Sequence, residues 1–282
     1  MLIDIHAHLQ FGAYDADREA IIQQCAEQDI SVINVGTNRQ TSQDALVLAH
    51  RYPERFWAAV GLHPTHLISS PRDPDESASG SDIVPAEEFQ CAVYQELARD
   101  EKTVGIGECG LDYFHLERDY GFSPEQIAQE KERQQEVFAA HIRLAKEVGK
   151  PLVIHCRDAY GDVLAVVRRE GMPAAGGDVH FFAGDMQTAQ QFLDLGFSLS
   201  FTGAITFKNA AAYADVIRSL PLDRLMAETD APYVAPEPFR GTRNTPLYVR
   251  QVVEKIAAIR NISFDEAALA TFTNAKKLFK LG

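Results

Sequence analysis

Short apolar runs alternate with longer amphipathic stretches along the whole chain. The short runs have the composition of buried strands, and the stretches between them are long enough for helices. The pattern predicts eight strands, at Leu2–His8, Ser31–Gly36, Phe56–Gly61, Thr103–Glu108, Pro151–His155, Asp178–Phe182, Phe197–Phe201 and Arg224–Thr229.

The helical pattern is clearest over Glu130–Val148, where Val137, Leu144, Ala145 and Val148 form an apolar stripe with charged residues on the opposite face. His141 falls on that stripe, so we interpret it as a packed core histidine.

A last helix is predicted near the C-terminus. Ser263 and Glu266 have the spacing of a capping box, and Leu269, Phe272 and Phe279 follow at helical spacing.

Eight strand–helix alternations without a break in composition predict a single α/β domain over residues 1–282, a parallel (β/α)8 TIM barrel with an extra C-terminal helix. A doubly wound open sheet is the alternative, because periodicity does not report closure. Residues 69–85 interrupt the rhythm with Pro, Ser and acidic residues and predict a loop insertion. In a barrel this loop lies on the catalytic rim, where it either shades the site or is an ordinary surface insertion.

The composition is that of a globular protein, with 46% hydrophobic residues in 282, and the formal net charge is −13. That charge argues against a broad basic face that coats nucleic acid or an anionic membrane. Neither a signal peptide nor an apolar run of membrane-spanning length is present, and the four cysteines form no CxxC pair. We therefore expect a reduced, cytoplasmic protein with no membrane association, and no feature points to an obligate protein partner.

Five of the nine histidines stand at the ends of predicted strands. They are His6, His8, His63, His155 and His180. Glu108 and Asp230 stand at two further strand ends. In a barrel these ends converge on one rim, where active sites are built.

His6 and His8 are two residues apart, so in a strand both imidazoles point to the same face and can bind one cation. Glu108 has two oxygens with which to bridge two ions, and Asp230 can ligate an ion and accept a proton from water. Two divalent ions at this rim would hold a phosphoryl group and activate water near neutral pH. The alternative is that Glu108 and Asp230 form buried ion pairs with nearby cations.

Gly105, Gly107 and Gly110 spell G-x-G-x-x-G after a predicted strand, which is the dinucleotide-binding pattern. The context argues against that function, because residues 111–114 and a polar loop follow where a helix should begin, and Glu108 lies inside the turn.

Together these motifs resemble the TatD family of metal-dependent deoxyribonucleases, within the amidohydrolase-like barrels. The resemblance runs nearly end to end, through DIHAHL (4–9), VGLHP (60–64), GIGECGLDY (105–113), residues 134–159, HFFAG (180–184), ETDAPY (228–233), RGTRNTP (240–246) and NAKKLF (274–279).

The resemblance implies a two-metal site. One ion would lie on His6, His8, Glu108 and Asp230, and the second on Glu108, His155 and His180, so that Glu108 bridges them. The sequence does not choose among zinc, manganese, magnesium and iron. The implied activity is hydrolysis of phosphodiester bonds at DNA strand ends, in the 3′–5′ direction, in DNA repair or degradation, with single-stranded DNA or strand ends as substrate.

Further catalytic and binding roles follow as hypotheses. Asp230 would act as base or orient the attacking water, and His63 would contact the phosphate or protonate the leaving oxygen, unless it is a structural loop histidine. Arg157, Arg240 and Arg243 would bind the scissile or a flanking phosphate, unless they form surface salt bridges.

Two departures from the family pattern bear on substrate range. Phe181 and Ala183 stand where the family usually has Cys and Ser, and residues 69–85 and 115–123 look longer than usual. The alternative activity is metal-dependent hydrolysis of a small ester, lactone, cyclic amide, phosphotriester or aminoacyl-tRNA ester. Many related barrels bridge their metals with a carboxylated lysine, and residues 103–110 contain none, which favours the nuclease. A scaffold without activity would show eroded ligands.

Overall fold

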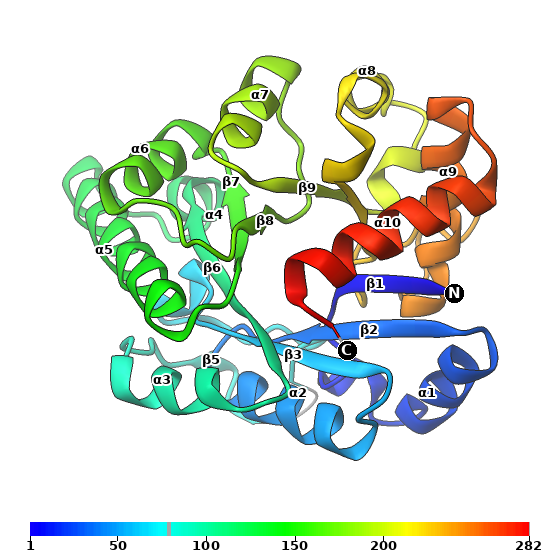
Figure 1. Cartoon of the computed structure of the whole chain (residues 1–282). Coiled ribbons are helices and arrows are strands. Elements are labelled where there is room, and N and C mark those ends of the chain that lie inside the picture. Colours follow the sequence, from blue (N-terminus) through cyan, green and yellow to red (C-terminus); the bar gives the residue numbers. More distant parts are fainter. Residues whose placement is uncertain (78–79, 282) are drawn as a thin grey trace.

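The computed structural model describes residues 1–77 and 80–281. Eight parallel strands form one sheet in the order β1-β2-β3-β6-β7-β8-β9-β10 (Figure 1). All eight predicted strands are confirmed, with bounds β1 Leu2–Ala7, β2 Ile30–Val35, β3 Phe56–Val60, β6 Thr103–Asp112, β7 Leu152–Arg157, β8 Gly177–Val179, β9 Ser198–Phe201 and β10 Leu225–Ala227.

The two edge strands come together and nearly close the sheet into a barrel. Ala7 at the end of β1 forms a parallel bridge with Ala231, just beyond β10. The amide of His8 donates to the Ala231 carbonyl at 2.8 Å, and the amide of Asp230 donates to the His6 carbonyl at 2.8 Å. The (β/α)8 barrel is therefore confirmed, and the open sheet is excluded.

Helices surround the barrel and cover the outer face of its strands (Figure 1). The longest, α5, starts at a capping box formed by Ser123 and Gln126 and ends at Gly149 in the left-handed conformation. The helices are α1 Arg18–Glu27, α2 Arg39–Arg51, α3 Cys91–Arg99, α4 Tyr113–Arg118, α5 Pro124–Val148, α6 Tyr160–Glu170, α7 Met186–Asp194, α8 Ala211–Ser219, α9 Val249–Arg260 and α10 Phe264–Phe279.

Five short 3-10 helices complete the described chain, at η1 Gly12–Tyr14, η2 Pro64–Leu67, η3 Gly203–Thr206, η4 Leu222–Arg224 and η5 Pro246–Tyr248. His141 is completely buried on α5, as the apolar stripe predicts. Its Nδ1 lies 2.8 Å from the Val137 carbonyl, and its Nε2 accepts from the Leu62 amide at 3.1 Å.

The extra C-terminal helix closes one end of the barrel. Phe279 at the end of α10 and the adjacent Leu281 belong to the same buried cluster as Ile3 and Ile5 of β1 and Val153 of β7. Figure 1 shows α10 lying across this end. Because the N-terminal ends of the strands are filled with apolar side chains, a polar site has room only at their C-terminal ends.

A β-bulge in β1 decides which of its side chains face inward. Asp4 pairs with Val32 and Ala7 pairs with Asn34, so β1 has one residue more than β2 over this stretch. Without the bulge, strict alternation would place Ile5 and His6 on opposite faces. The extra residue reverses the alternation, and the apolar lining of the barrel continues into the polar side chains of the site.

A second bulge lies in β6 at Glu108. Ile106 pairs with Leu152 and Cys109 with Ile154, so three steps on β6 match two on β7. The glycines of the G-x-G-x-x-G motif allow this close pairing, because a Cβ on Gly107 or Gly110 would lie 2.3 Å from the Val153 carbonyl oxygen or 2.0 Å from that of His155. The motif therefore packs two strands together.

The structure corrects the sequence prediction for the residues after this motif. The strand continues beyond Glu108 to Asp112, and the short helix α4 follows where a polar loop was expected. The Asp112 carboxylate caps α4 by accepting from the His115 amide at 2.9 Å.

The stretch 69–85 includes a small antiparallel hairpin, β4 Ser70–Pro71 and β5 Ile83–Val84. Glu76 attaches its described part to the barrel by accepting from Thr37 at 2.5 Å and Asn38 at 3.0 Å, and by pairing with His66 at 3.1 Å. The Tyr233 hydroxyl, from the chain beyond β10, donates to Asp73 at 2.6 Å. This segment therefore contacts loops that follow strands, on the side of the barrel where the histidines lie.

Candidate metal centre

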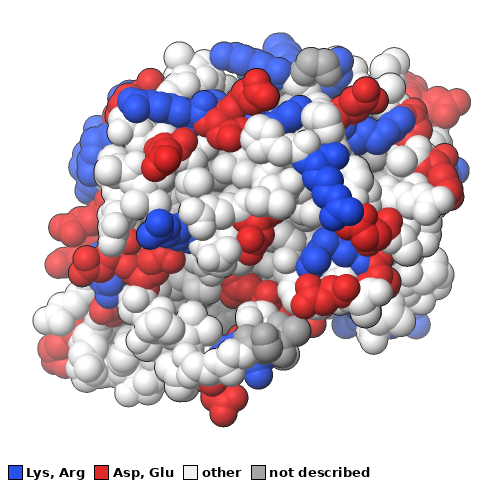
Figure 2. All heavy atoms as spheres, turned by 90° about the horizontal axis from the view of Figure 1, so that it is seen from below, with Lys and Arg blue, Asp and Glu red and all other residues white. Residues whose placement is uncertain are grey.

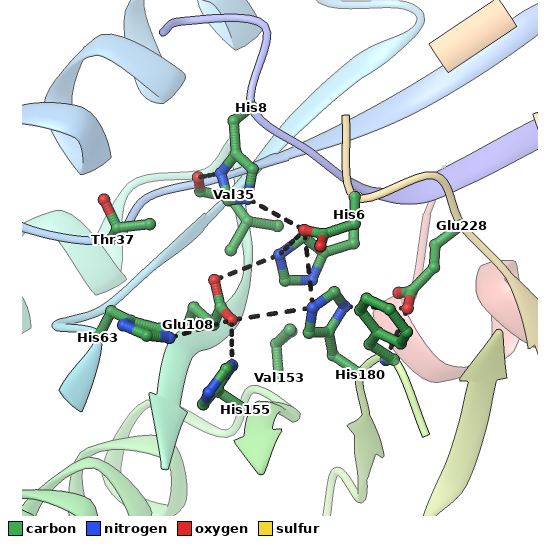
Figure 3. A network of polar contacts seen from close by, with 12 residues as sticks. His6, His8, Val35, Thr37, His63, Glu108, Val153, His155, His180 and Glu228 are labelled. Atoms are coloured by element: carbon green, nitrogen blue, oxygen red, sulfur yellow. Dashed lines mark hydrogen bonds and ion pairs between the residues drawn. The ribbon is translucent and has the colours of Figure 1, made fainter. Parts of the chain in front are cut away.

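Ionisable side chains from widely separated strands gather at the C-terminal end of the barrel (Figure 3). His6 lies in β1, Glu108 in β6 and His155 in β7. His8 and His180 directly follow β1 and β8, and Asp230 lies three residues beyond the end of β10. His6, His8, Glu108 and His180 are almost completely buried. The structure thus brings together all six residues predicted as metal ligands.

Glu108 is the centre of the cluster, and its two oxygens face different groups. Oε2 lies 3.4 Å from Nε2 of His6. Oε1 lies 3.0 Å from Nδ1 of His155 and 3.8 Å from Nε2 of His180. This is the arrangement that a carboxylate needs to serve two adjoining ligand groups.

Asp230 faces the other side of the cluster. Its Oδ1 lies 3.5 Å from Nε2 of His8, 3.7 Å from Nε2 of His180 and 4.0 Å from Nε2 of His6. Donor atoms suited to a metal ion therefore group as His6, His8 and Asp230, and as His6, Glu108 and His180. A third such group is His63, Glu108 and His155.

Polar contacts on the far side of the rings orient two histidines of the centre. Nδ1 of His8 donates to the Val35 carbonyl at 2.7 Å, and Nδ1 of His180 lies 2.9 Å from Oε1 of Glu228. A metal ion bound at Nε2 would leave the proton on Nδ1, where each ring already has an oxygen partner.

His155 is held in the same manner by a different carboxylate. Its Nε2 lies 3.0 Å from Oδ2 of Asp112 and its Nδ1 lies 3.0 Å from Oε1 of Glu108, so the ring is held between two carboxylates. Asp112 Oδ2 also lies 2.7 Å from Nδ1 of His115. The carboxylate that caps α4 thereby orients a residue of the centre.

His63 has its ring proton on the other nitrogen. Its Nδ1 accepts from the Thr65 amide at 3.3 Å, so the proton is on Nε2, which faces Oε1 of Glu108 at 3.6 Å. Burial lowers the pKa of His63 to about 3, so the ring is neutral. His63 therefore offers an N–H to the site, which suits hydrogen bonding to a substrate oxygen better than metal ligation.

His6 provides the fit test for a metal. Both of its ring nitrogens are buried without a hydrogen-bond partner among the described residues. A buried polar atom left unpaired costs about 1–3 kcal/mol. Since Nε2 is directed at Glu108 and stands among imidazoles and carboxylates, a divalent cation satisfies it and matches the donor set.

The electrostatics of the centre also favour a cation. Burial alone would raise the pKa of Glu108, but His63, His6 and His155 outweigh it and hold the pKa well below its usual range. Burial likewise opposes protonation of His155 and His180, yet the adjacent carboxylates raise the pKa to about 9 for His155 and about 10 for His180. The attraction of the carboxylates for a positive charge therefore outweighs the free-energy cost of burying that charge.

The three predicted phosphate-binding arginines occupy different environments. Arg157 lies over the Phe114 ring, with its guanidinium carbon 3.8 Å from the centroid, and Arg240 lies 4.3 Å from that of Phe207. Arg243 donates to both oxygens of Asp17, at 3.0 and 2.6 Å, so much of its hydrogen-bonding capacity is used. Arg157 is connected to the centre by successive hydrogen bonds through His115 and Asp112.

Sequence reasoning missed Glu228, Asp112 and Asp4. Glu228 and Asp112 orient His180 and His155. Asp4 accepts from the amide of Thr229 at 2.9 Å and from its hydroxyl at 2.5 Å, which fastens β1 to the segment that carries Asp230. The available signal was a carboxylate placed two residues before a ligand, as in Asp4 and His6 or in Glu228 and Asp230.

Comparison with known proteins adds to this geometry. The family model for TatD related DNases matches residues 3–280. The chain belongs to the TatD family. Its assignment confirms the resemblance drawn from the sequence motifs.

Curated relatives in the TatD family match the chain over nearly its full length. A protein of Bacillus subtilis named as the uncharacterized metal-dependent hydrolase YabD is 40% identical over 100% of both chains. One of Escherichia coli, named as the uncharacterized metal-dependent hydrolase YcfH, is 34% identical over 99% of this chain and 96% of its own. The chain is accordingly a metal-dependent hydrolase of the TatD family.

Solved TatD structures agree with the fold. The crystal structure of YJJV, a TatD homolog from Escherichia coli, has a TM-score of 0.80 at 30% identity and covers 100% of this chain and 98% of its own. A TatD family hydrolase from Entamoeba histolytica has a TM-score of 0.75 at 21% identity, over 98% of this chain and 97% of its own.

Among the helices of residues 1–77 and 80–281, none combines the length and the apolar character that a membrane span requires.

Proposed function

We propose that this TatD family hydrolase is a deoxyribonuclease that cleaves phosphodiester bonds at the ends of DNA strands through a two-metal site. The observation that carries the proposal is Glu108, whose two oxygens face His6 on one side and His155 and His180 on the other. Paired metal sites are typical of phosphoryl-transfer enzymes, because charge develops on both the attacking and the leaving oxygen.

His6, His8, Glu108 and Asp230 would hold one ion, and Glu108, His155 and His180 the other. When bound, the ions supply Lewis acidity that makes water acidic and neutralises charge on the phosphoryl oxygens.

The protein's own side chains supply orientation and proton transfer. Asp230 has a pKa below its usual value, because His180, His8 and His6 outweigh the effect of burial. It is therefore ionised at neutral pH and able to accept a proton from the attacking water. His63 Nε2–H donates to a phosphate oxygen, and the Arg157 guanidinium binds a phosphate.

The charge distribution supports action on strand ends. Figure 2 shows acidic and basic side chains interspersed on the face in view, with no broad basic surface. The net charge of −13 disfavours wrapping of duplex DNA. Binding of a strand end needs only a small positively charged site, which two divalent ions and the nearby arginines would provide.

A cleavage assay on defined substrates tests the proposal. Purified protein loaded with Zn²⁺, Mn²⁺ or Mg²⁺ is incubated with single-stranded DNA labelled at the 5′ or the 3′ end, next to panels of lactones, phosphotriesters and aminoacyl esters. We expect stepwise shortening from the 3′ end that requires the metal. Rapid turnover of a small ester without DNA cleavage would instead establish the small-substrate activity.

A further inference from the structure

Two guanidinium groups lie on one aromatic ring beside the metal centre. The guanidinium carbon of Arg157 is 3.8 Å from the centroid of the Phe114 ring, and that of Arg118 is 3.9 Å from it. Phe114 and Arg118 belong to α4, and Arg157 ends β7. Contact with the ring restricts both guanidinium groups, so less side-chain entropy is lost when they bind a ligand.

This cluster is connected to the metal centre by consecutive hydrogen bonds. Nη1 of Arg157 donates to Nε2 of His115 at 3.4 Å, and Nδ1 of His115 lies 2.7 Å from Oδ2 of Asp112. The same Oδ2 lies 3.0 Å from Nε2 of His155. Along β7, Arg157 is two residues beyond His155, so both side chains leave the strand on the same face.

The positive charge of the cluster is incompletely compensated. Among the described residues, Arg157 has no carboxylate within ion-pair distance. Arg118 has Asp158 at 3.8 Å, and both of these side chains are 59% exposed. A pair this long and exposed contributes little, so Arg118 is available to an anion from solution.

Arg118 ends α4, the helix that directly follows the strand carrying Glu108. Two restrained guanidinium groups next to the reacting site, in a protein of charge −13, match a ligand that carries more than one negative charge. A polynucleotide has a phosphate on each nucleotide, whereas a lactone or simple ester has none.

We propose that Arg118, Phe114 and Arg157 form a subsite for the phosphate that neighbours the scissile one in a single-stranded polynucleotide. The subsite makes the enzyme prefer substrates with at least two consecutive phosphates. This inference rests on the proposed nuclease function and adds a substrate requirement to it.

The experiment pairs single variants with single changes in the substrate. Arg118→Gln is compared with wild type on the metal-loaded enzyme, using a thymidine trinucleotide and the same molecule with an uncharged methylphosphonate at the linkage that is not cleaved. For wild type we expect the methylphosphonate to lower kcat/KM about 3- to 10-fold. Arg118→Gln should lose a similar factor on the natural trinucleotide and none on the methylphosphonate.

Arg250→Gln is the matched control. Arg250 also stacks on a phenylalanine, at 4.7 Å from Phe264, and pairs with Glu254 at 3.0 Å on α9. The variant removes the same charge and the same kind of ring contact, and we expect wild-type behaviour on both substrates. If Arg118→Gln and Arg250→Gln reduce activity equally, or if Arg118→Gln loses the same factor on both substrates, the subsite is refuted.

A binding measurement separates this inference from the proposed nuclease activity. We expect a fluorescein-labelled thymidine octanucleotide to bind the metal-loaded protein with a salt dependence whose slope falls by about 0.7 in Arg118→Gln. If the slope of the salt dependence falls in Arg118→Gln and wild type does not cleave DNA, the result would support phosphate binding by Arg118 and overturn the nuclease proposal. DNA cleavage with an unchanged slope and unchanged kcat/KM in Arg118→Gln would do the reverse.

Discussion

Nδ1 of His155 and Oε1 of Glu108 lie 3.0 Å apart across the neighbouring strands β7 and β6. The contact depends on the bulge in β6, which pairs Cys109 with Ile154 and thereby places Glu108 beside His155. His155 is held from its other side by Asp112, the N-cap of α4. The position of His155 in the centre thus depends on a strand irregularity and on the N-cap of a helix.

We expect Glu108→Ala to abolish metal-dependent hydrolysis. The substitution removes both oxygens that face the two groups of histidines, so neither group keeps its shared ligand. Metal content by mass spectrometry should fall together with the cleavage rate, while circular dichroism shows an intact fold. Full activity in a folded Glu108→Ala protein would refute the bridging role.

Glu228→Gln should weaken metal binding about 10- to 100-fold without removing a ligand. Glu228 fixes the ring of His180 at 2.9 Å and also accepts from the Phe181 amide at 2.7 Å. The amide keeps the size of the side chain and loses the charge. Competition with a chromogenic chelator measures the affinity, and Glu254→Gln, at an exposed position of α9, is a control that removes the same charge. An affinity equal to wild type would show that Glu228 only supports the backbone.

His141 should make the protein less stable in acid. Burial lowers its pKa in the folded state to about 4, below the value of about 6.5 for an unfolded chain. The unfolded state therefore binds the proton first, so the stabilisation is present above pH 6.5 and is lost as pH falls toward 4. Between pH 7 and pH 5 the loss is about 2 kcal/mol.

Comparison with His141→Gln isolates this contribution. Urea unfolding at both pH values should show that the stability gap between wild type and variant narrows by about 2 kcal/mol in acid. A gap that is the same at pH 7 and pH 5 would mean that His141 does not carry the effect.

Removing the metal should stop hydrolysis and leave the barrel folded. The ligands stand on strands whose apolar cluster is separately closed by Phe279 and Leu281, so the fold does not depend on the ions. Ligand linkage predicts a loss of about 2.7 kcal/mol relative to protein held at a free metal concentration 100 times Kd. Thermal unfolding should stay cooperative with a lower midpoint after chelation, and added divalent metal should restore the midpoint and the activity. Collapse of the cooperative transition would assign the ions a role in folding.

Much of this fold could be predicted from local patterns of residues in the sequence. The eight strands follow from short apolar runs, because strands of a barrel are buried on both faces, and the stripe of α5 follows from burial of one helix face at a period of 3.6. The residues predicted as metal ligands lie together, since parallel strands bring their C-terminal ends to one rim. The buried state of His141 followed from its place on the stripe.

The orientation of these side chains was decided only by the tertiary structure. The bulges in β1 and β6 turn His6 and Glu108 toward the centre, and each is a relation between two strands that one strand's pattern does not contain. His8 and His180 are oriented by Val35 and Glu228, which are distant from them in the sequence, whereas the tautomer of His63 is set by its near neighbour Thr65. The sequence by itself determined which atoms are available for metal chemistry, and pairing across strands determined where their lone pairs point.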